Sequence, residues 1–300
     1  MTRVTRQKEA GRAYLDLQNR ARRERRNTQE LLTLYVVERW LARLSRSAYT
    51  EQFVLKGGML LATFGARRPT ADADALARDM ANDEATVVAR IVEIAGLADN
   101  DGVEFRTNTV TARTIRDEAL YAGVRVTMDA RLATATVRFR IDVNFGDPVT
   151  PAPQMIDLPA LRPDDAPIRI LGYPIETVLA EKITTAITLG AANTRVRDYA
   201  DIYTLIGKHD LQHATVRDAL MATGKFRGTP LQPLSAAIDD LADLRHATYT
   251  AYRTSLGADG EHLPQAFSTI VDTVATFADH LIEAQPLSTT WHAQDQSWHP

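Results

Sequence analysis

Three aspartates have the residue type and spacing that bind a divalent cation. Asp72 and Asp74 are separated by one residue, so in an extended chain both carboxylates project from the same face. Two like charges that close require a cation or a shared proton. Asp142 lies on the polar face of a second extended segment. On neighbouring strands the three would form an oxygen-ligand set suited to Mg²⁺. The alternative is that Asp72 and Asp74 are turn residues and Asp142 is a surface acid.

A glycine pair precedes the two aspartates. Gly57 and Gly58 stand between a short apolar segment and a short helical one. In such a turn, backbone N–H groups can approach phosphate oxygens. The spacing G-x-x-x-x-G-K-[ST] of a P-loop is absent. The pair is therefore either a phosphate-binding turn of another kind or a plain tight turn.

A lysine in the second half of the chain occupies an unusual position. Lys182 shares the apolar side of its predicted helix with Val178 and Ala186. A buried ammonium group is unfavourable unless an acid or a phosphate compensates it. Asp198 or Asp201 on the next predicted helix could supply that acid. The alternatives are a surface lysine with a buried stem and a capping role for Asp198.

Five arginines lie close together near the start of the chain. The formal net charge of the whole chain is −3, so any nucleic-acid binding must use a local patch. The arginines form either a solvated helix end or a patch for RNA phosphates. The cluster consists of Arg20, Arg22, Arg23, Arg25 and Arg26.

The elements that must position these residues fall into two groups. The first half carries strand patterns at 52–55, 67–74 and 137–145, helical patterns at 28–44 and 82–95, and a β-rich stretch over 103–145. After Pro174 the pattern is almost entirely helical, at 175–189, 197–207, 215–223, 231–244 and 264–284. We expect the tail, 287–300, to be polar and loose. The chain is thus predicted to be an α/β (α+β) protein with a mixed-sheet domain over 1–160 and a helical domain over 161–300.

Composition narrows the class of protein. The 300 residues include 45% hydrophobic and 24% charged side chains, which is ordinary for a globular protein. There is no cysteine, which excludes a cysteine nucleophile and agrees with a cytoplasmic location. No apolar run approaches the ~18 residues of a membrane span, and the charged first dozen residues do not resemble a signal peptide. We expect no membrane partner and a monomer.

Five short segments follow one another in a recognisable order. They are 56–60 (KGGML), 68–74 (RPTADAD), 141–147 (IDVNFGD), 180–182 (AEK) and 197–203 (RDYADIY). Together they resemble the AbiEii/MenT-type nucleotidyltransferase toxins of the DNA polymerase β-like nucleotidyltransferase superfamily. The resemblance covers roughly residues 15–210.

The resemblance implies a bilobed protein and a reaction. It implies Mg²⁺-dependent transfer of a nucleotide from an NTP to an RNA acceptor, with the tRNA 3′ end as acceptor in studied members, and a cognate antitoxin. Such a transfer would block translation and growth. By position in the motifs, Asp72 and Asp74 would hold the metal, joined by Asp142 as a ligand or general base.

The other roles follow from the same resemblance. Gly57, Gly58 and Thr70 would border the triphosphate, Lys182 would contact it, and Asp198 would be the essential acid of the last segment, so that Asp72, Lys182 and Asp198 are the expected catalytic residues. Two alternatives remain open: transfer of a nucleotide to a protein or small molecule, and a non-catalytic module that binds RNA or a partner.

Overall fold

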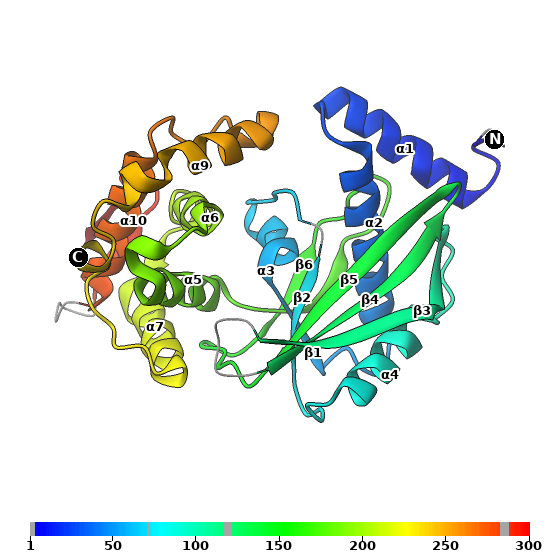
Figure 1. Cartoon of the computed structure of the whole chain (residues 1–300), viewed down its shortest axis with the longest axis horizontal. Coiled ribbons are helices and arrows are strands. Elements are labelled where there is room, and N and C mark those ends of the chain that lie inside the picture. The colour runs from blue at the N-terminus through cyan, green and yellow to red at the C-terminus, as the bar shows by residue number, and fades with distance from the viewer. Residues whose placement is uncertain (1–3, 71, 117–121, 283–287) are drawn as a thin grey trace. The chain divides into compact units, whose positions relative to one another are not determined.

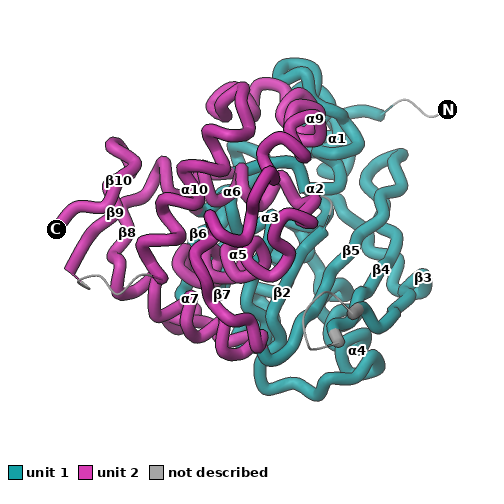
Figure 2. Tube along the Cα trace, turned by 60° about the vertical axis from the view of Figure 1, so that its left-hand side comes forward, with its two compact units in different colours: residues 1–63, 67–146, 154–172 teal, residues 64–66, 147–153, 173–300 magenta. Residues whose placement is uncertain are grey.

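The computed structural model describes residues 4–70, 72–116, 122–282 and 288–300. The chain forms two compact units (Figure 2). Unit 1 contains residues 1–63, 67–146 and 154–172, and unit 2 contains residues 64–66, 147–153 and 173–300. The architecture is mixed α/β, as predicted. In the described ranges no helix is both long and apolar enough to cross a membrane.

Unit 1 is built on a seven-stranded mixed sheet (Figure 1). Its strand order is β3-β4-β5-β2-β1-β7-β6. β2 runs parallel to β5 and β7 parallel to β1, while the remaining neighbours are antiparallel. The strands are β1 (Phe53–Lys56), β2 (Ala73–Ala77), β3 (Val103–Arg116), β4 (Ala122–Leu132), β5 (Ala135–Phe145), β6 (Gln154–Leu158) and β7 (Ile168–Gly172).

Helices cover one face of this sheet. α2 (Thr28–Leu44) contacts β5 and β7, and α4 (Glu84–Ala95) contacts β3 and β4. Trp40 of α2 is fully buried, with its ring 6.1 Å from that of Phe53 and 5.6 Å from that of Phe139. Because side chains alternate along a strand, the apolar set of each strand faces these helices. The charged set is left on the opposite face.

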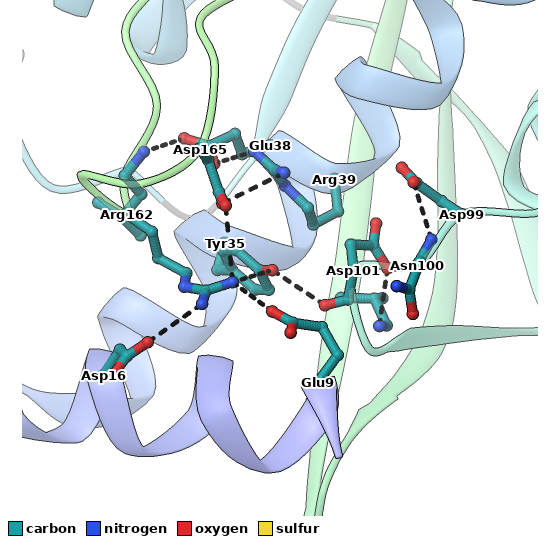
Figure 3. A network of polar contacts seen from close by, with 12 residues as sticks. Glu9, Asp16, Tyr35, Glu38, Arg39, Asp99, Asn100, Asp101, Arg162 and Asp165 are labelled. Atoms are coloured by element: carbon teal, nitrogen blue, oxygen red, sulfur yellow. Dashed lines mark hydrogen bonds and ion pairs between the residues drawn. The ribbon is translucent and has the colours of Figure 1, made fainter. Parts of the chain in front are cut away.

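A buried polar network fixes the chain between β6 and β7 onto the helices (Figure 3). Arg162 donates to Glu9 at 2.7 Å and to Asp16 at 3.1 Å, both on α1 (Glu9–Glu24). The Tyr35 hydroxyl of α2 accepts from Arg162 Nη1 at 3.5 Å and donates to the carbonyl of Asp101 at 2.9 Å. These contacts hold α1, α2 and the β6–β7 connection together, so the proline-rich connection is part of the framework of unit 1.

Unit 2 is mainly helical. α5 contacts α6 and α7, and α10 contacts α6, α7, α8 and α9. A small sheet of order β10-β9-β8 completes the unit. The elements are α5 (Ile175–Leu189), α6 (Val196–Ile206), β8 (Leu211–Gln212), α7 (His213–Arg227), α8 (Leu234–Ala237), α9 (Leu241–Ser255), α10 (Phe267–Ile282), β9 (Thr290–His292) and β10 (Ser297–His299).

The structure changes several sequence-based boundaries. The strand predicted at 67–74 begins only at Ala73, since Pro69 has no N–H for a strand ladder. The helix predicted at 231–244 is two helices, because Asp240 has a left-handed backbone with φ +56°. Residues 161–172, assigned above to the helical domain, pack in unit 1 because β7 pairs with β1.

The prediction of a loose tail was wrong for the residues described. β9 and β10 pair with each other, and β9 pairs with β8. Trp291 is fully buried and its indole N–H donates to the carbonyl of Ile206 at 2.7 Å. The tail was expected to be loose because most of its residues are polar, but the buried Trp291 holds it against the rest of unit 2. Parts of four predicted segments lie outside the described residues, namely residues 71, 117–121, 283–284 and 287.

Candidate active site

A row of charged side chains crosses the open face of the sheet in unit 1. Cross-strand register pairs Lys56 with Asp74, Asp74 with Asp142, Asp142 with Arg125, and Arg125 with Arg113. In-register side chains lie roughly 4.5–5.5 Å apart at Cβ. The row therefore brings two predicted metal ligands together, with cationic side chains on either side.

Asp74 is the most perturbed acid of the row. Its pKa is raised to about 6, chiefly by burial and then by the neighbouring charge of Asp142, while Lys56 acts to lower it and Asp72 to raise it further. A raised carboxyl pKa means that the charged form lacks full compensation. A cation placed at this position would supply that compensation.

Asp142 is held by an arginine. Arg125 donates from Nε to Oδ1 at 2.7 Å and from Nη2 to Oδ2 at 2.5 Å, the two-pronged geometry typical of strong arginine–carboxylate pairs. These hydrogen bonds raise the pKa of Arg125. With both carboxylate oxygens occupied, Asp142 orients Arg125 in this arrangement.

Asp72 immediately precedes β2 and faces Arg140 of β5. Arg140 Nη1 lies 3.3 Å from both carboxylate oxygens, with hydrogen-bond geometry only toward Oδ2. Asp72 Oδ1 is buried and accepts no hydrogen bond in the structure. This atom and the uncompensated Asp74 fit a divalent cation, for which carboxylate oxygens are suitable ligands.

The three predicted ligands do not form a ready-made metal site. Across the described part of the chain, no group of three or more His, Asp or Glu side chains is arranged to hold a metal ion. The reason at this site is visible: Arg125 occupies Asp142 and Arg140 lies beside Asp72. Asp72 and Asp74 are thus the fitting ligands, and Asp142 could join them only after parting from Arg125.

The glycine turn abuts the acids. Gly57 has φ +66°, and a Cβ at this position would lie 2.7 Å from Cγ of Asp74. A Cβ on Gly58 would lie 2.7 Å from Thr70 Oγ1 and 3.3 Å from Arg68 Nη1. The turn is therefore packed directly against Asp74 and Thr70. The structure thus gathers three of the four predicted triphosphate-binding residues beside the acids, and the fourth, Lys182, belongs to unit 2.

Lys182 forms a separate charged cluster within unit 2. Its ammonium group donates to Asp198 Oδ1 at 2.6 Å and to Asp201 Oδ2 at 2.9 Å. The lysine comes from α5, both acids come from α6, and all three side chains are largely buried. The expected proximity of Lys182 and Asp198 is confirmed, and Asp201 is a second partner.

The N-terminal arginines divide into two kinds. Arg20 pairs with Glu24 at 2.8 Å and donates to the carbonyl of Leu161, and Arg26 pairs with Glu30. The other three, Arg22, Arg23 and Arg25, are exposed at the end of α1. The patch predicted to contact RNA phosphates is therefore reduced to these three.

Sequence reasoning missed the arginines that face the acids. Arg140 could have been found, because strand alternation places it on the polar face that carries Asp142. Arg125 had no local signal, since its pairing with Asp142 depends on the register between β4 and β5.

No curated protein matches the sequence. The solved structures that resemble the chain include JHP933 from Helicobacter pylori, with a TM-score of 0.49, 12% identity, and coverage of 83% of this chain and 91% of that one. Another is an H. pylori protein described as a candidate nucleotidyltransferase, with a TM-score of 0.47, 12% identity, and coverage of 85% and 98%.

A family profile gives the assignment. The profile of the nucleotidyl transferase AbiEii toxin of type IV toxin–antitoxin systems matches residues 39–273. The match spans the glycine turn, the three aspartates and the Lys182 cluster. The chain therefore belongs to the AbiEii nucleotidyl transferase toxin family.

Proposed function

We propose that this family member transfers a nucleotide from an NTP to an RNA acceptor, with Mg²⁺ bound by Asp72 and Asp74 and with a tRNA 3′ end as the acceptor. The observation that carries the proposal is the juxtaposition of Asp74 with the Gly57-Gly58 turn. A carboxylate whose charge is incompletely compensated, next to a glycine turn that opens a short helix, is suited to a metal–triphosphate substrate. We further propose that the protein acts in the cytoplasm, as a monomer, and is countered by a cognate antitoxin.

The residues have separate tasks in this proposal. The backbone of Gly57 and Gly58 and the hydroxyl of Thr70 would bind phosphate oxygens. When bound, Mg²⁺ would neutralise the triphosphate and lower the pKa of the attacking hydroxyl. Lys182 would contact a phosphate oxygen of the triphosphate.

The reaction balances without a further co-substrate. The acceptor 3′-oxygen forms a bond to the α-phosphorus, and the bond from that phosphorus to the β-phosphate oxygen breaks. Pyrophosphate leaves with the electron pair of that bond, and the hydroxyl proton passes to solvent. Arg125, oriented by Asp142, would stabilise negative charge on the reacting phosphate.

The direct test is incorporation of labelled nucleotide. The full chain is incubated with each of the four α-³²P-labelled NTPs, with total RNA and then with protein extract, in Mg²⁺ and in EDTA. We expect a labelled tRNA band that requires Mg²⁺ and disappears in Asp72→Asn. Asp157→Asn is the matched control, because Asp157 is an exposed acid on β6 of the same sheet and lies outside the row of charged side chains.

Other outcomes would redirect the assignment. Label on protein or on a small molecule with RNA present would replace the RNA acceptor. RNA binding without incorporation of a nucleotide from any NTP would indicate a non-catalytic, RNA-binding protein. Equal activity in EDTA would refute the metal, and equal activity in Asp72→Asn would refute this site.

A further inference from the structure

The open face of β3, β4 and β5 is lined with arginines. Register and strand alternation place these side chains on the same face as Asp142 and opposite the helices. Arg116 and Ala122, which flank residues 117–121, are not counted as part of this face. The arginines of this face, hereafter the arginine face, are Arg106, Arg113, Arg125, Arg131, Arg138 and Arg140.

The arginine face carries excess positive charge. Its described acids are Glu104, Asp129 and Asp142, half as many as the arginines. Arg131 pairs with Glu104 at 2.6 Å and Arg138 with Asp129 at 3.3 Å. Exposed pairs of this kind contribute little stability, so these arginines remain available to a ligand.

Two arginines of the face have no acidic partner. Within the described ranges, neither Arg106 nor Arg113 takes part in an ion pair, and Arg113 is exposed. Arg113 stands in the row that leads through Arg125 to Asp142 and Asp74. The positive surface is therefore continuous with the candidate active site.

The chemistry of the face favours phosphates over bases. The aromatic residues of these strands, Phe105, Phe139 and Phe145, lie on the opposite face, where the rings of Phe105 and Phe139 are 5.5 Å apart. Among its described residues the open face thus offers guanidinium and hydroxyl groups but no ring. Proteins that read unpaired bases stack them on aromatic side chains, whereas duplex RNA is bound through its backbone.

The length of the face suits several phosphates. Arg125 and Arg131 are six residues apart on β4, which is roughly 20 Å at ~3.4 Å per residue. We propose that the arginine face binds the sugar–phosphate backbone of a base-paired RNA stem and thereby presents the end of that RNA to the acids. The inference rests on the proposed function, because it supplies the acceptor side of the same site.

The test measures binding in the absence of NTP, so it is independent of catalysis. The probe is a fluorescein-labelled RNA hairpin with a 12-base-pair stem, titrated with the full chain from 50 to 300 mM salt and followed by anisotropy. The test variant is Arg113→Gln/Arg131→Gln/Arg138→Gln. Arg131 and Arg138 have exposed side-chain fractions of 51% and 68%, so their removal leaves the core intact.

A matched control removes the same charge at exposed positions outside the arginine face. Arg12 of α1 and Arg46 after α2 have exposed fractions of 44% and 54% and each pairs with one acid, and Arg78 is exposed. The control variant is therefore Arg12→Gln/Arg46→Gln/Arg78→Gln. It matches the test variant in number of charges, exposure and broken surface pairs.

We expect the test variant to bind the hairpin at least ~10-fold more weakly at 0.15 M salt, with a salt slope reduced by about two to three. The control should keep both values. Equal losses in both variants, or no loss in either, would overturn the proposal. So would equal affinity for an unstructured oligouridine, or for polyglutamate of the same charge. The single variant Arg113→Gln, with a slope lower by about one, repeats the test without breaking any ion pair.

The outcomes for RNA binding by the arginine face can be told apart from the outcomes for nucleotide transfer. Normal transfer to tRNA with unchanged hairpin binding in the test variant would reject the arginine face and keep the reaction. Loss of hairpin binding in a protein that incorporates no nucleotide would keep the face and reject the reaction.

Discussion

Substituting alanine for Gly57 tests the packing of the turn against Asp74. Gly57 has φ +66°, a left-handed conformation that costs a residue with a side chain about 1–2 kcal/mol. The added Cβ would also lie 2.7 Å from Cγ of Asp74, closer than any real Cβ contact. We therefore expect Gly57→Ala to lose about 2–4 kcal/mol of unfolding free energy, the sum of backbone strain and overpacking.

A second glycine separates the two contributions. Gly228, the C-cap residue of α7, has φ +64° but nothing within 4 Å of an added Cβ. Gly228→Ala should therefore lose only the backbone contribution of about 1–2 kcal/mol. The difference in unfolding free energy between Gly57→Ala and Gly228→Ala therefore measures the cost of the steric overlap with Asp74.

Activity should separate the two glycines further. Displacing the Asp74 carboxylate by about 1 Å is expected to reduce nucleotide incorporation about 100-fold, while Gly228→Ala should retain it. Urea denaturation gives the stability of each variant and labelled-NTP incorporation gives its rate. In an Asp74→Gly background, which removes all three Asp74 atoms that the added Cβ would meet, the extra stability loss of Gly57→Ala should shrink toward that of Gly228→Ala. Equal stability losses at the two glycines, or full activity in Gly57→Ala, would refute the reasoning.

Three further predictions follow from the charged clusters. Because the Asp74 pKa is raised to about 6 from 3.8, the folded state binds its proton more tightly, and wild-type stability falls as pH rises between these values. Asp74→Asn should therefore be about 3 kcal/mol more stable than wild type at pH 7–8 and no more stable below pH ~4. Urea denaturation across pH checks this, and a pH-independent difference would contradict it. Arg125→Gln leaves the buried Asp142 carboxylate without its partner and should lower the free energy of unfolding by about 2 kcal/mol. The melting temperature should fall accordingly, and an unchanged melting temperature would mean that the pair is not formed in solution. Lys182→Met should lower nucleotide incorporation about 100-fold in a protein whose circular dichroism is unchanged; near-normal incorporation would remove Lys182 from the mechanism.

Local patterns predicted the elements that carry the site. The helix expected at 175–189 is α5 with the same bounds, because a continuous apolar side and a starting Pro174 are signals within the segment. β5 was expected from the alternation of Phe139 and Ile141 with Arg138 and Arg140, and its burial follows that alternation. The same alternation placed Asp142 on the polar face.

Long-range contacts escaped prediction for a physical reason. The pairing of Arg125 with Asp142 and the approach of Gly57 to Asp74 depend on strand register and turn geometry. Trp291 was assigned to a loose tail because its flanking residues are polar, although its burial depends on α6, far away in sequence. Whether Asp142 ever binds metal also depends on competition between Arg125 and a cation, which no linear pattern encodes.

The position of β7 has a consequence for how the protein is made. β1 lies between β2 and β7, and β7 begins at Ile168, 112 residues after β1 ends at Lys56. At ~5–20 residues per second, the ribosome leaves β1 as an open sheet edge for several seconds, and such edges are prone to pair with other chains. Any fragment that ends before β7 keeps that edge permanently. We expect the nascent toxin to complete its central sheet only after residue 172 has emerged, so each newly made copy passes through an aggregation-prone interval before it can become active.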